Sequence, residues 1–287
     1  MGFNMFIQTC GKIARNPGAP TLRGWVRHSV WHLARRFSPL PMSVPLTAQS
    51  SLRLHERGEL NGCVALAWSQ RLYDYNNMSF VRELTRQGFV KVCMDVGANI
   101  GPYTLILSER PDVQVCCFEP HPRTFAVLQR MIESNDRGNV KAFNLALSDA
   151  PGRLWFTDEA CNPGNRILQE NEAGDAITVE ALTGREFCRR ENVVPDLLKI
   201  DTEGHEPGVL RGFGDILAHV KVLVLEENAP PETIAACLPP ATFLGPLYVD
   251  FDARRLTTTR TWHEDAVYVN RSAVAGLAGL GFHVETV

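Results

Sequence analysis

The chain has 287 residues, of which 45% are hydrophobic and 21% are charged. This composition is typical of a globular protein and excludes a disordered chain, a collagen-like repeat or a coiled coil. No stretch approaches the run of about 18 uncharged apolar residues that spans a bilayer, so we predict no transmembrane segment. The eight cysteines are scattered without a Cys-x-x-Cys pair, which argues against a zinc site or a disulfide scaffold and indicates a reducing, cytoplasmic setting.

Positive charge is concentrated before Glu56, the first acidic residue. Seven of the 29 basic residues precede it, which leaves 22 basic against 32 acidic residues in the remainder. An acidic body binds nucleic acid poorly, so we expect no nucleic-acid partner.

The segment 21–37 places five apolar side chains at helical spacing, with arginines between them. It is therefore predicted to form an amphipathic helix. Two interpretations stay open: the apolar face packs on the main domain, or the helix makes a peripheral contact with an anionic membrane. Three prolines then predict a linker: Pro39, Pro41 and Pro45. We divide the chain into a basic N-terminal extension, residues 1–55, and one domain, residues 56–287.

From residue 79 onward, short apolar runs alternate with helical patterns. The runs predicted to be strands are 89–96, 113–118, 139–147, 196–200, 220–227, 242–251 and 265–270. The predicted helices are 79–88, 102–110, 123–134 and 206–220. A β excursion at 152–157 and 176–182 surrounds a polar loop, residues 158–175. This alternation predicts an α/β fold with a mostly parallel sheet of about seven strands and helices on both faces.

The first strand ends in the sequence DVGANIG, residues 95–101, directly before a helix. Glycine permits a sharp turn and close approach of a ligand to the main chain. The spacing is D-x-G-x-x-x-G and not the G-x-G-x-x-G of dinucleotide sites. The carboxylate of Asp95 suits an ammonium better than a pyrophosphate. The turn therefore indicates S-adenosylmethionine, which carries an α-amino group.

The second strand ends at Glu119, 22 residues after Gly97. A carboxylate at this strand end can accept hydrogen bonds from both hydroxyls of a ribose. Two acids on adjacent strands are thus predicted to hold the two ends of one nucleoside.

Four segments, DVGANIG, CFEPHP, NLALSD and LLKIDTEGHE, resemble the FkbM-type S-adenosylmethionine-dependent methyltransferases over residues 75–270. The resemblance implies a class I methyltransferase fold, S-adenosylmethionine as methyl donor, and usually O-methylation of a sugar or polyketide hydroxyl. It places the methionine part of the cofactor among Asp95, Gly97, Ala98, Asn99 and Gly101. It also places Glu119 on the ribose, and Ala146 and Leu147 beside the adenine.

The predicted fourth strand ends in a segment that has five ionisable side chains within eight residues: Lys199, Asp201, Glu203, His205 and Glu206. Methyl transfer to a hydroxyl requires a close, aligned acceptor and removal of its proton. We predict His205, Glu203 and Asp201 as the catalytic residues, with His205 as the base at neutral pH. A helix-capping or surface role for His205 stays open, because the next helix begins there.

After the fifth strand come Glu226, Glu227 and Asn228, which with Asp201 resemble the magnesium ligands of catechol-type O-methyltransferases. We predict no metal, because the rest of that pattern is absent from the sequence. His121 is predicted to lie in a rigid loop beyond the ribose, and residues 262–265 to lie either over the acceptor pocket or in an exposed hairpin.

The predicted function is S-adenosylmethionine-dependent O-methylation of a glycan or natural-product hydroxyl, the acceptor being the expected partner. Two alternatives stay open. One is a methyltransferase-like binding module without turnover. The other is an NAD-dependent oxidoreductase, which the glycine spacing disfavours.

Overall fold

The computed structural model describes Val26 and residues 40–56, 59, 72, 74–168, 175–260 and 265–285. The predicted amphipathic helix at 21–37 lies outside these ranges except for Val26, which is helical and exposed. Residues 262–264 lie outside them as well. Within the described ranges, no helix combines the length and the apolar character needed to cross a bilayer.

Among the described residues, the main sheet has nine strands in the order β14-β12-β11-β13-β10-β9-β3-β4-β5. Five of them run parallel to one another: β3 (Val92–Val96), β4 (Gln114–Phe118), β5 (Val140–Phe143), β9 (Leu197–Ile200) and β10 (Val222–Leu225). Antiparallel pairing brings in β13 (Ala266–Asn270) beside β10 and then β11 (Phe243–Asp250) beside β13. The α/β fold and the mostly parallel sheet are confirmed.

The sheet exceeds the expected seven strands because two short edge strands extend it. These are β12 (Arg255–Thr257), which pairs with β11, and β14 (His283–Val284). Strands of three and two residues are too short to produce an alternating pattern, so the sequence did not reveal them.

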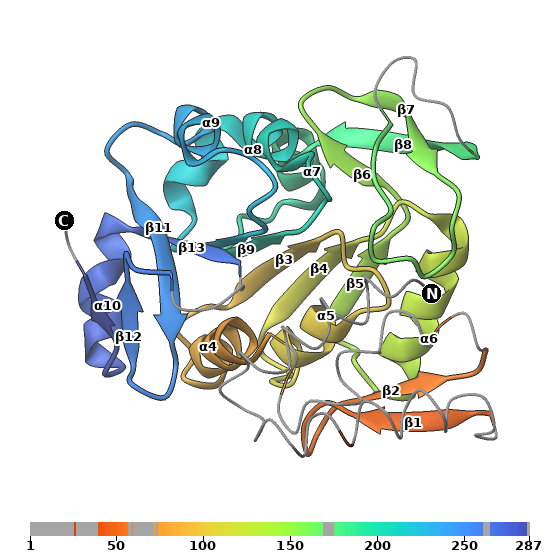
Figure 1. Cartoon of the computed structure of the whole chain (residues 1–287), viewed down its shortest axis with the longest axis horizontal. Coiled ribbons are helices and arrows are strands. Elements are labelled where there is room, and N and C mark those ends of the chain that lie inside the picture. Colours follow the sequence, from red (N-terminus) through yellow and green to blue (C-terminus); the bar gives the residue numbers. More distant parts are fainter. Residues whose placement is uncertain are drawn as a thin grey trace.

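Helices cover both faces of this sheet, as expected (Figure 1). One face carries α4 (Tyr75–Arg86), α5 (Pro102–Leu107), α6 (Pro122–Ser134) and α10 (Val274–Gly279). The other carries α7 (Gly184–Glu191), α8 (Glu206–Phe213), the 3-10 helix Gly214–His219 and α9 (Pro231–Cys237). Successive side chains of a strand point to opposite faces, so Leu197 and Leu198 of β9 belong to different apolar cores.

The segment 139–147 forms two strands in place of one. β5 ends at Phe143, and from Ala146 the chain forms β6 (Ala146–Ser148) in a separate three-stranded sheet with β8 (Ala176–Thr183) and β7 (Gly152–Thr157). At the break, the Asn144 side chain donates hydrogen bonds to the carbonyls of Glu119 and Pro120, at 2.8 and 2.9 Å. The β excursion around 152–182 is confirmed.

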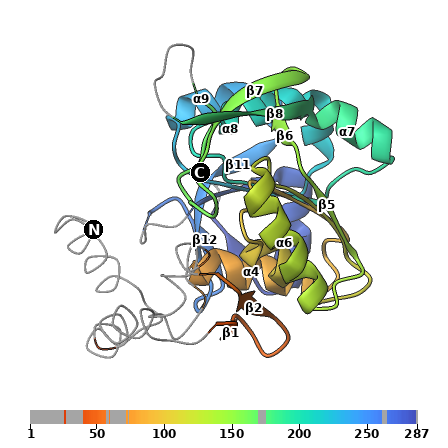
Figure 2. The ribbon, with the colours of Figure 1, turned by 90° about the vertical axis from the view of Figure 1, so that its right-hand side faces the viewer.

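The proline segment predicted as a linker instead forms part of a hairpin. β1 (Met42–Pro45) pairs antiparallel with β2 (Ser51–Leu54), and Figure 2 shows the hairpin beside α6. Leu52 and Leu54 are fully buried in a core that they share with Val127 and Met131 of α6. Prolines here lie at the ends of an edge strand, where a missing N–H is tolerated. The domain boundary at residue 55 stays a prediction.

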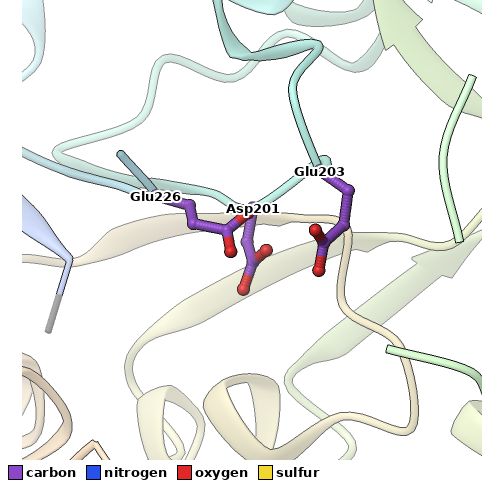
Figure 3. Close-up of side chains that lie close together, drawn as sticks. All are labelled: Asp201, Glu203 and Glu226. Carbon is purple, nitrogen blue, oxygen red and sulfur yellow. The ribbon is translucent and has the colours of Figure 1, made fainter. Parts of the chain in front are cut away.

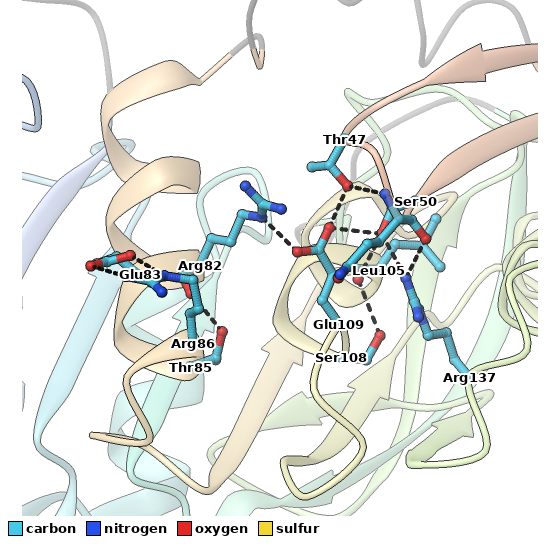
Figure 4. Close-up of polar contacts among 11 residues, drawn as sticks. Thr47, Ser50, Arg82, Glu83, Thr85, Arg86, Leu105, Ser108, Glu109 and Arg137 are labelled. Carbon is cyan, nitrogen blue, oxygen red and sulfur yellow. Dashed lines mark hydrogen bonds and ion pairs between the residues drawn. The ribbon is translucent and has the colours of Figure 1, made fainter.

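One buried carboxylate connects this hairpin to the helices (Figure 4). Glu109 accepts hydrogen bonds from the hydroxyls of Thr47 and Ser50 and from Arg82 Nε of α4, the last at 2.6 Å. Arg137 adds a bond to Ser50 Oγ at 2.8 Å. The loop of the hairpin is thus fastened to the body through side chains on three other segments.

Candidate functional site

The carboxyl ends of β3, β4, β9 and β10 meet at one edge of the sheet, where α/β proteins bind ligands. Four predicted site residues follow these ends or lie next to them: Asp95, Gly97, Glu119 and Asp201. The antiparallel strand β13 begins at the same edge, because Ala266 pairs with Leu225. Asp265, which is distant in sequence from the other four residues, therefore lies at this edge as well.

The glycine turn after β3 is required by packing of the protein itself. Gly97 has φ of +82°, and a Cβ there would lie 1.8 Å from the Asp201 carbonyl oxygen. Gly101 has φ of +93°, and its Cβ would lie 2.6 Å from Leu128. The N–H groups of Gly97 and Ala98 donate to the Phe118 carbonyl at 3.0 and 2.9 Å. Contacts with the residue after β9, with β4 and with α6 therefore fix the conformation of the turn through the packing of the protein itself.

Asp95 is 2% exposed and accepts a hydrogen bond from Thr104 Oγ1 of α5 at 2.6 Å. Burial raises the pKa of this carboxyl to about 6, although the Thr104 bond and the nearby Lys199 charge oppose the shift. Its orientation is thus determined by α5, and its contact with an ammonium stays a prediction.

Glu119 connects the two loops that were predicted to share the cofactor. One carboxylate oxygen accepts the N–H of Asn99 at 3.0 Å and the other accepts the N–H of His121 at 2.9 Å. Burial raises the pKa of Glu119 to about 7. Because a carboxylate offers about four lone-pair sites, two acceptor positions are left for ligand hydroxyls.

The side-chain oxygen of Asn99 is a buried acceptor that can be used to test whether a cofactor fits this site. Its backbone has φ of +50°, and its Nδ2 donates to the Asn162 carbonyl at 3.3 Å. Its Oδ1 is buried and has no hydrogen-bond partner among the described residues. A buried acceptor without a partner is costly, so a hydroxyl or ammonium donor of a ligand suits this position. The donor groups of S-adenosylmethionine therefore fit the residues present.

The polar segment 158–162 lies across the same turn, a contact that the sequence did not predict. The Cys161 N–H donates to Thr124 Oγ1 at 2.9 Å, while Asp158 bonds to His121 and Arg123 at 3.1 and 2.8 Å. His121 is fully buried and caps α6 by accepting the Thr124 N–H. Its predicted place in a rigid loop is consistent with these contacts. We call residues 158–162 the clasp.

Ala146 and Leu147 begin β6 and are 6% and 1% exposed. Leu147 packs in the core that contains Phe187, and Ala146 packs in the small sheet. Their predicted position beside the adenine stays a prediction.

Three carboxylates from the ends of β9 and β10 point into one space (Figure 3). One oxygen from each of Asp201, Glu203 and Glu226 lies within 4.8 Å of the others. We call these three residues the acid cluster. Burial and the neighbouring Asp201 raise the pKa of Glu226 to about 9, and burial followed by Asp201 and Glu206 raises that of Glu203 to about 7.

Lys199, an ionisable residue for which the sequence predicted no role, lies behind this cluster. It is 1% exposed on β9, and its Nζ lies 3.1 Å from Asp201 Oδ2 and 2.9 Å from Asp265 Oδ2. The ammonium also lies 5.0 Å from the centre of the Tyr103 ring. The available signal was a single cation inside an apolar strand, which pairs with carboxylates when it is buried.

His205 is the N-cap residue of α8 but makes no side-chain capping bond. Its Nε2 lies 2.9 Å from Ser148 Oγ, and a Cβ on Gly208 would lie 2.6 Å from the ring. Burial lowers the pKa of His205. Glu206 shapes the loop in front of it by accepting the N–H groups of Thr202 and Gly204 at 3.0 and 3.1 Å.

The acid cluster has the hard oxygen ligands that Mg²⁺ prefers. Glu227, the second acid of the predicted pattern, instead accepts the Tyr248 hydroxyl at 2.7 Å and pairs with Arg260 at 2.7 Å. Asn228 donates to Glu226. The predicted absence of a metal stays a prediction.

A search against family profiles matches residues 95–257 to the methyltransferase FkbM domain. The chain belongs to the FkbM methyltransferase family. The match begins at the glycine turn and includes the clasp and the acid cluster. The mostly parallel main sheet with helices on both faces agrees with the α/β fold that the resemblance implied.

Three curated relatives align with part of this FkbM chain. The hexuronic acid methyltransferase AglP of Haloferax volcanii is 33% identical over 48% of this chain and 56% of its own length. Methyltransferase sdnD of Sordaria araneosa is 30% identical over 42% of this chain and 60% of its own. The 2-O-methyltransferase NoeI of Sinorhizobium fredii is 26% identical over 47% of this chain and 62% of its own. The chain thus spans less than two thirds of each relative.

Proposed function

We propose that this protein is an S-adenosylmethionine-dependent methyltransferase that methylates a hydroxyl of a sugar, glycan or natural product. The observation that carries the proposal is the Glu119 carboxylate, which is buried at the end of β4 and bonded to the N–H of Asn99. This bond makes the glycine turn and the second acid parts of one ligand-binding edge. Family membership supports the reaction class.

The cofactor-holding residues act through complementary donors and acceptors. Glu119 keeps two acceptor positions for the ribose hydroxyls, and the unpartnered Oδ1 of Asn99 accepts a further donor. The negative charge of Asp95 favours a cationic ligand at the same turn. S-adenosylmethionine, when bound, supplies an electrophilic methyl group on a sulfonium.

Glu203 is our choice for the general base. Its pKa of about 7 is near the ideal for proton transfer at neutral pH, and its side chain is half-buried. His205 is less suitable because burial lowers its pKa and its Nε2 already faces Ser148 Oγ. Glu203 would take the proton of the acceptor hydroxyl, while Asp201 and Glu226 border the space in front of it.

The acceptor class rests on the relatives. One is named a hexuronic acid methyltransferase and another a 2-O-methyltransferase, which favours a sugar oxygen. A hydroxyl acceptor also agrees with a carboxylate base, because an alcohol must lose its proton during transfer.

Isothermal calorimetry with S-adenosylhomocysteine tests the cofactor, and transfer of a labelled methyl group to a panel of sugars and cell extracts tests the reaction. We expect binding by the intact protein, weakened in Asp95→Ala and Glu119→Ala, and labelled product. No binding by the wild type would reject the proposal. Binding without product across the panel would favour the non-catalytic binding module, and tight NADH binding would favour the oxidoreductase.

A further inference from the structure

We propose that Lys199 is a positioning residue: its ammonium, held between Asp201 and Asp265, keeps the Asp201 carboxylate in place at the back of the acceptor site. This inference rests on the proposed function, because it assigns a role within the same site. Lys199 is a charged residue whose burial is energetically unfavourable.

A buried lysine is destabilising unless its charge is compensated. Lys199 is 1% exposed and lies in the middle of the main sheet, where its Cα pairs with Asp95 of β3 and Val224 of β10. An apolar residue at this position would fill the strand without that penalty. Packing alone therefore does not explain why this position carries a charged lysine.

The two carboxylates that compensate it come from different strands. Asp201 follows β9 and Asp265 precedes β13, and β10 lies between these strands. One ammonium thus bridges across β10, with its charge also facing the Tyr103 ring of α5. Asp265 is held from its other side by Asn77 of α4, which donates to its backbone carbonyl at 2.8 Å.

The bridge determines where Asp201 can point. The side chain of Asp201 is 38% exposed, so burial alone does not determine its orientation. With Oδ2 held at 3.1 Å from Lys199, its carboxylate stays within 4.8 Å of the Glu203 and Glu226 oxygens. Because Lys199 is itself buried, we assign it a role that acts through Asp201.

A second lysine of the same sheet supplies a matched control. Lys221 pairs with Asp196 at 3.0 Å and lies 5.3 Å from the Phe89 ring, so it repeats the carboxylate and aromatic partners of Lys199. It precedes β10, which places it at the opposite edge from the site. Lys221→Met should leave turnover unchanged.

The test compares Lys199→Met, Asp265→Asn and the double variant by thermal unfolding, S-adenosylhomocysteine calorimetry and turnover with an acceptor identified by the labelled-methyl screen. For Lys199→Met we expect turnover to fall about 100-fold, the loss typical of an approximately 1 Å misplacement, with cofactor affinity nearly unchanged. Asp265→Asn should keep turnover within a few-fold, because Lys199 still holds Asp201.

The double variant is decisive because it removes both charges of the buried pair. We expect it to regain thermal stability without regaining turnover. Recovery of turnover in the double variant would overturn the proposal, since Lys199 would then only balance Asp265. Wild-type turnover in Lys199→Met, or a parallel loss of cofactor binding, would overturn it as well. A wild type that neither binds S-adenosylhomocysteine nor transfers methyl groups would instead refute the proposed function.

Discussion

The carbonyl oxygen of Asp201 lies where a side chain on Gly97 would have to be, 1.8 Å from the ideal Cβ position. The glycine turn after β3 and the loop after β9 are therefore in direct backbone contact. The Asp201 N–H donates to the Val96 carbonyl at 3.0 Å and strengthens the same junction. A change in one of these segments is expected to move the other.

Gly97→Ala should both destabilise the protein and impair cofactor binding. The added methyl group would collide with the Asp201 carbonyl, which is a backbone group and cannot move aside by changing a side-chain rotamer. The control is Gly204→Ala: its φ of +104° is also unfavourable for alanine, but no atom of the described residues lies within 4 Å of the added Cβ. Positive φ alone costs about 1–2 kcal/mol, so Gly97→Ala should lose clearly more than that. Equal free energies of unfolding for the two variants, from urea titrations, would contradict the collision argument.

Cofactor affinity should depend on the ionisation of Glu119. Its pKa is raised to about 7, so the carboxylate form decreases as the pH falls below 7. Because the proposed ribose contact requires an ionised acceptor, S-adenosylhomocysteine should bind more weakly at pH 6 than at pH 8. Glu119→Gln should lower affinity roughly 10- to 100-fold, the equivalent of a charged hydrogen bond of about 1.5–3 kcal/mol. A Gln variant that retains the wild-type pH dependence would show that another group titrates.

Turnover should rise with pH through about 7 as Glu203 loses its proton, because the raised pKa leaves the carboxyl protonated below that value. Glu203→Gln should lower turnover about 10²- to 10⁴-fold, as expected for loss of a general base, and remove this rise. His205→Ala, the matched comparison, should retain most of the rate. The reverse result, with His205→Ala inactive and Glu203→Gln active, would return the base to the residue first predicted from the sequence.

The clasp should slow cofactor release. Asp158→Ala removes its bonds to His121 and Arg123, so S-adenosylhomocysteine should dissociate up to about tenfold faster, in line with about 0.5–1.5 kcal/mol for each hydrogen bond. Asp112→Ala removes ion pairs to Lys91 and Arg110 near the amino-terminal edge of the sheet and serves as the control. Stopped-flow dissociation rates that are equal for the two variants would contradict a role for the clasp.

Removal of divalent ions should leave turnover unchanged. The charge of the acid cluster is already reduced by Lys199 on Asp201 and by the raised pKa of Glu226, about 9, which keeps that carboxyl protonated at neutral pH. Dialysis against EDTA followed by activity measurement tests this. A loss that Mg²⁺ restores would identify Asp201, Glu203 and Glu226 as metal ligands.

Much of the fold was predictable because strands and helices leave local patterns. The apolar run before DVGANIG predicted β3, and the run before Glu119 predicted β4. Once the strands are parallel, their carboxyl ends share an edge, so Asp95, Glu119 and Asp201 were expected near one another. The hairpin at 42–54 was missed, since two four-residue strands separated by a short loop produce little periodicity.

The sequence by itself determined the alternating architecture, the glycine turn and the location of the ionisable side chains at the end of β9 and after it. Only the tertiary structure decided which of those side chains are engaged elsewhere: His205 by Ser148, Glu206 by the loop before α8, and Lys199 by Asp265, which is far along the chain. The physical reason is that hydrophobic periodicity reflects the environment of residues that are close together in the sequence. Partner choice and proton affinity, in contrast, depend on distances and burial that arise when β13 pairs beside β10.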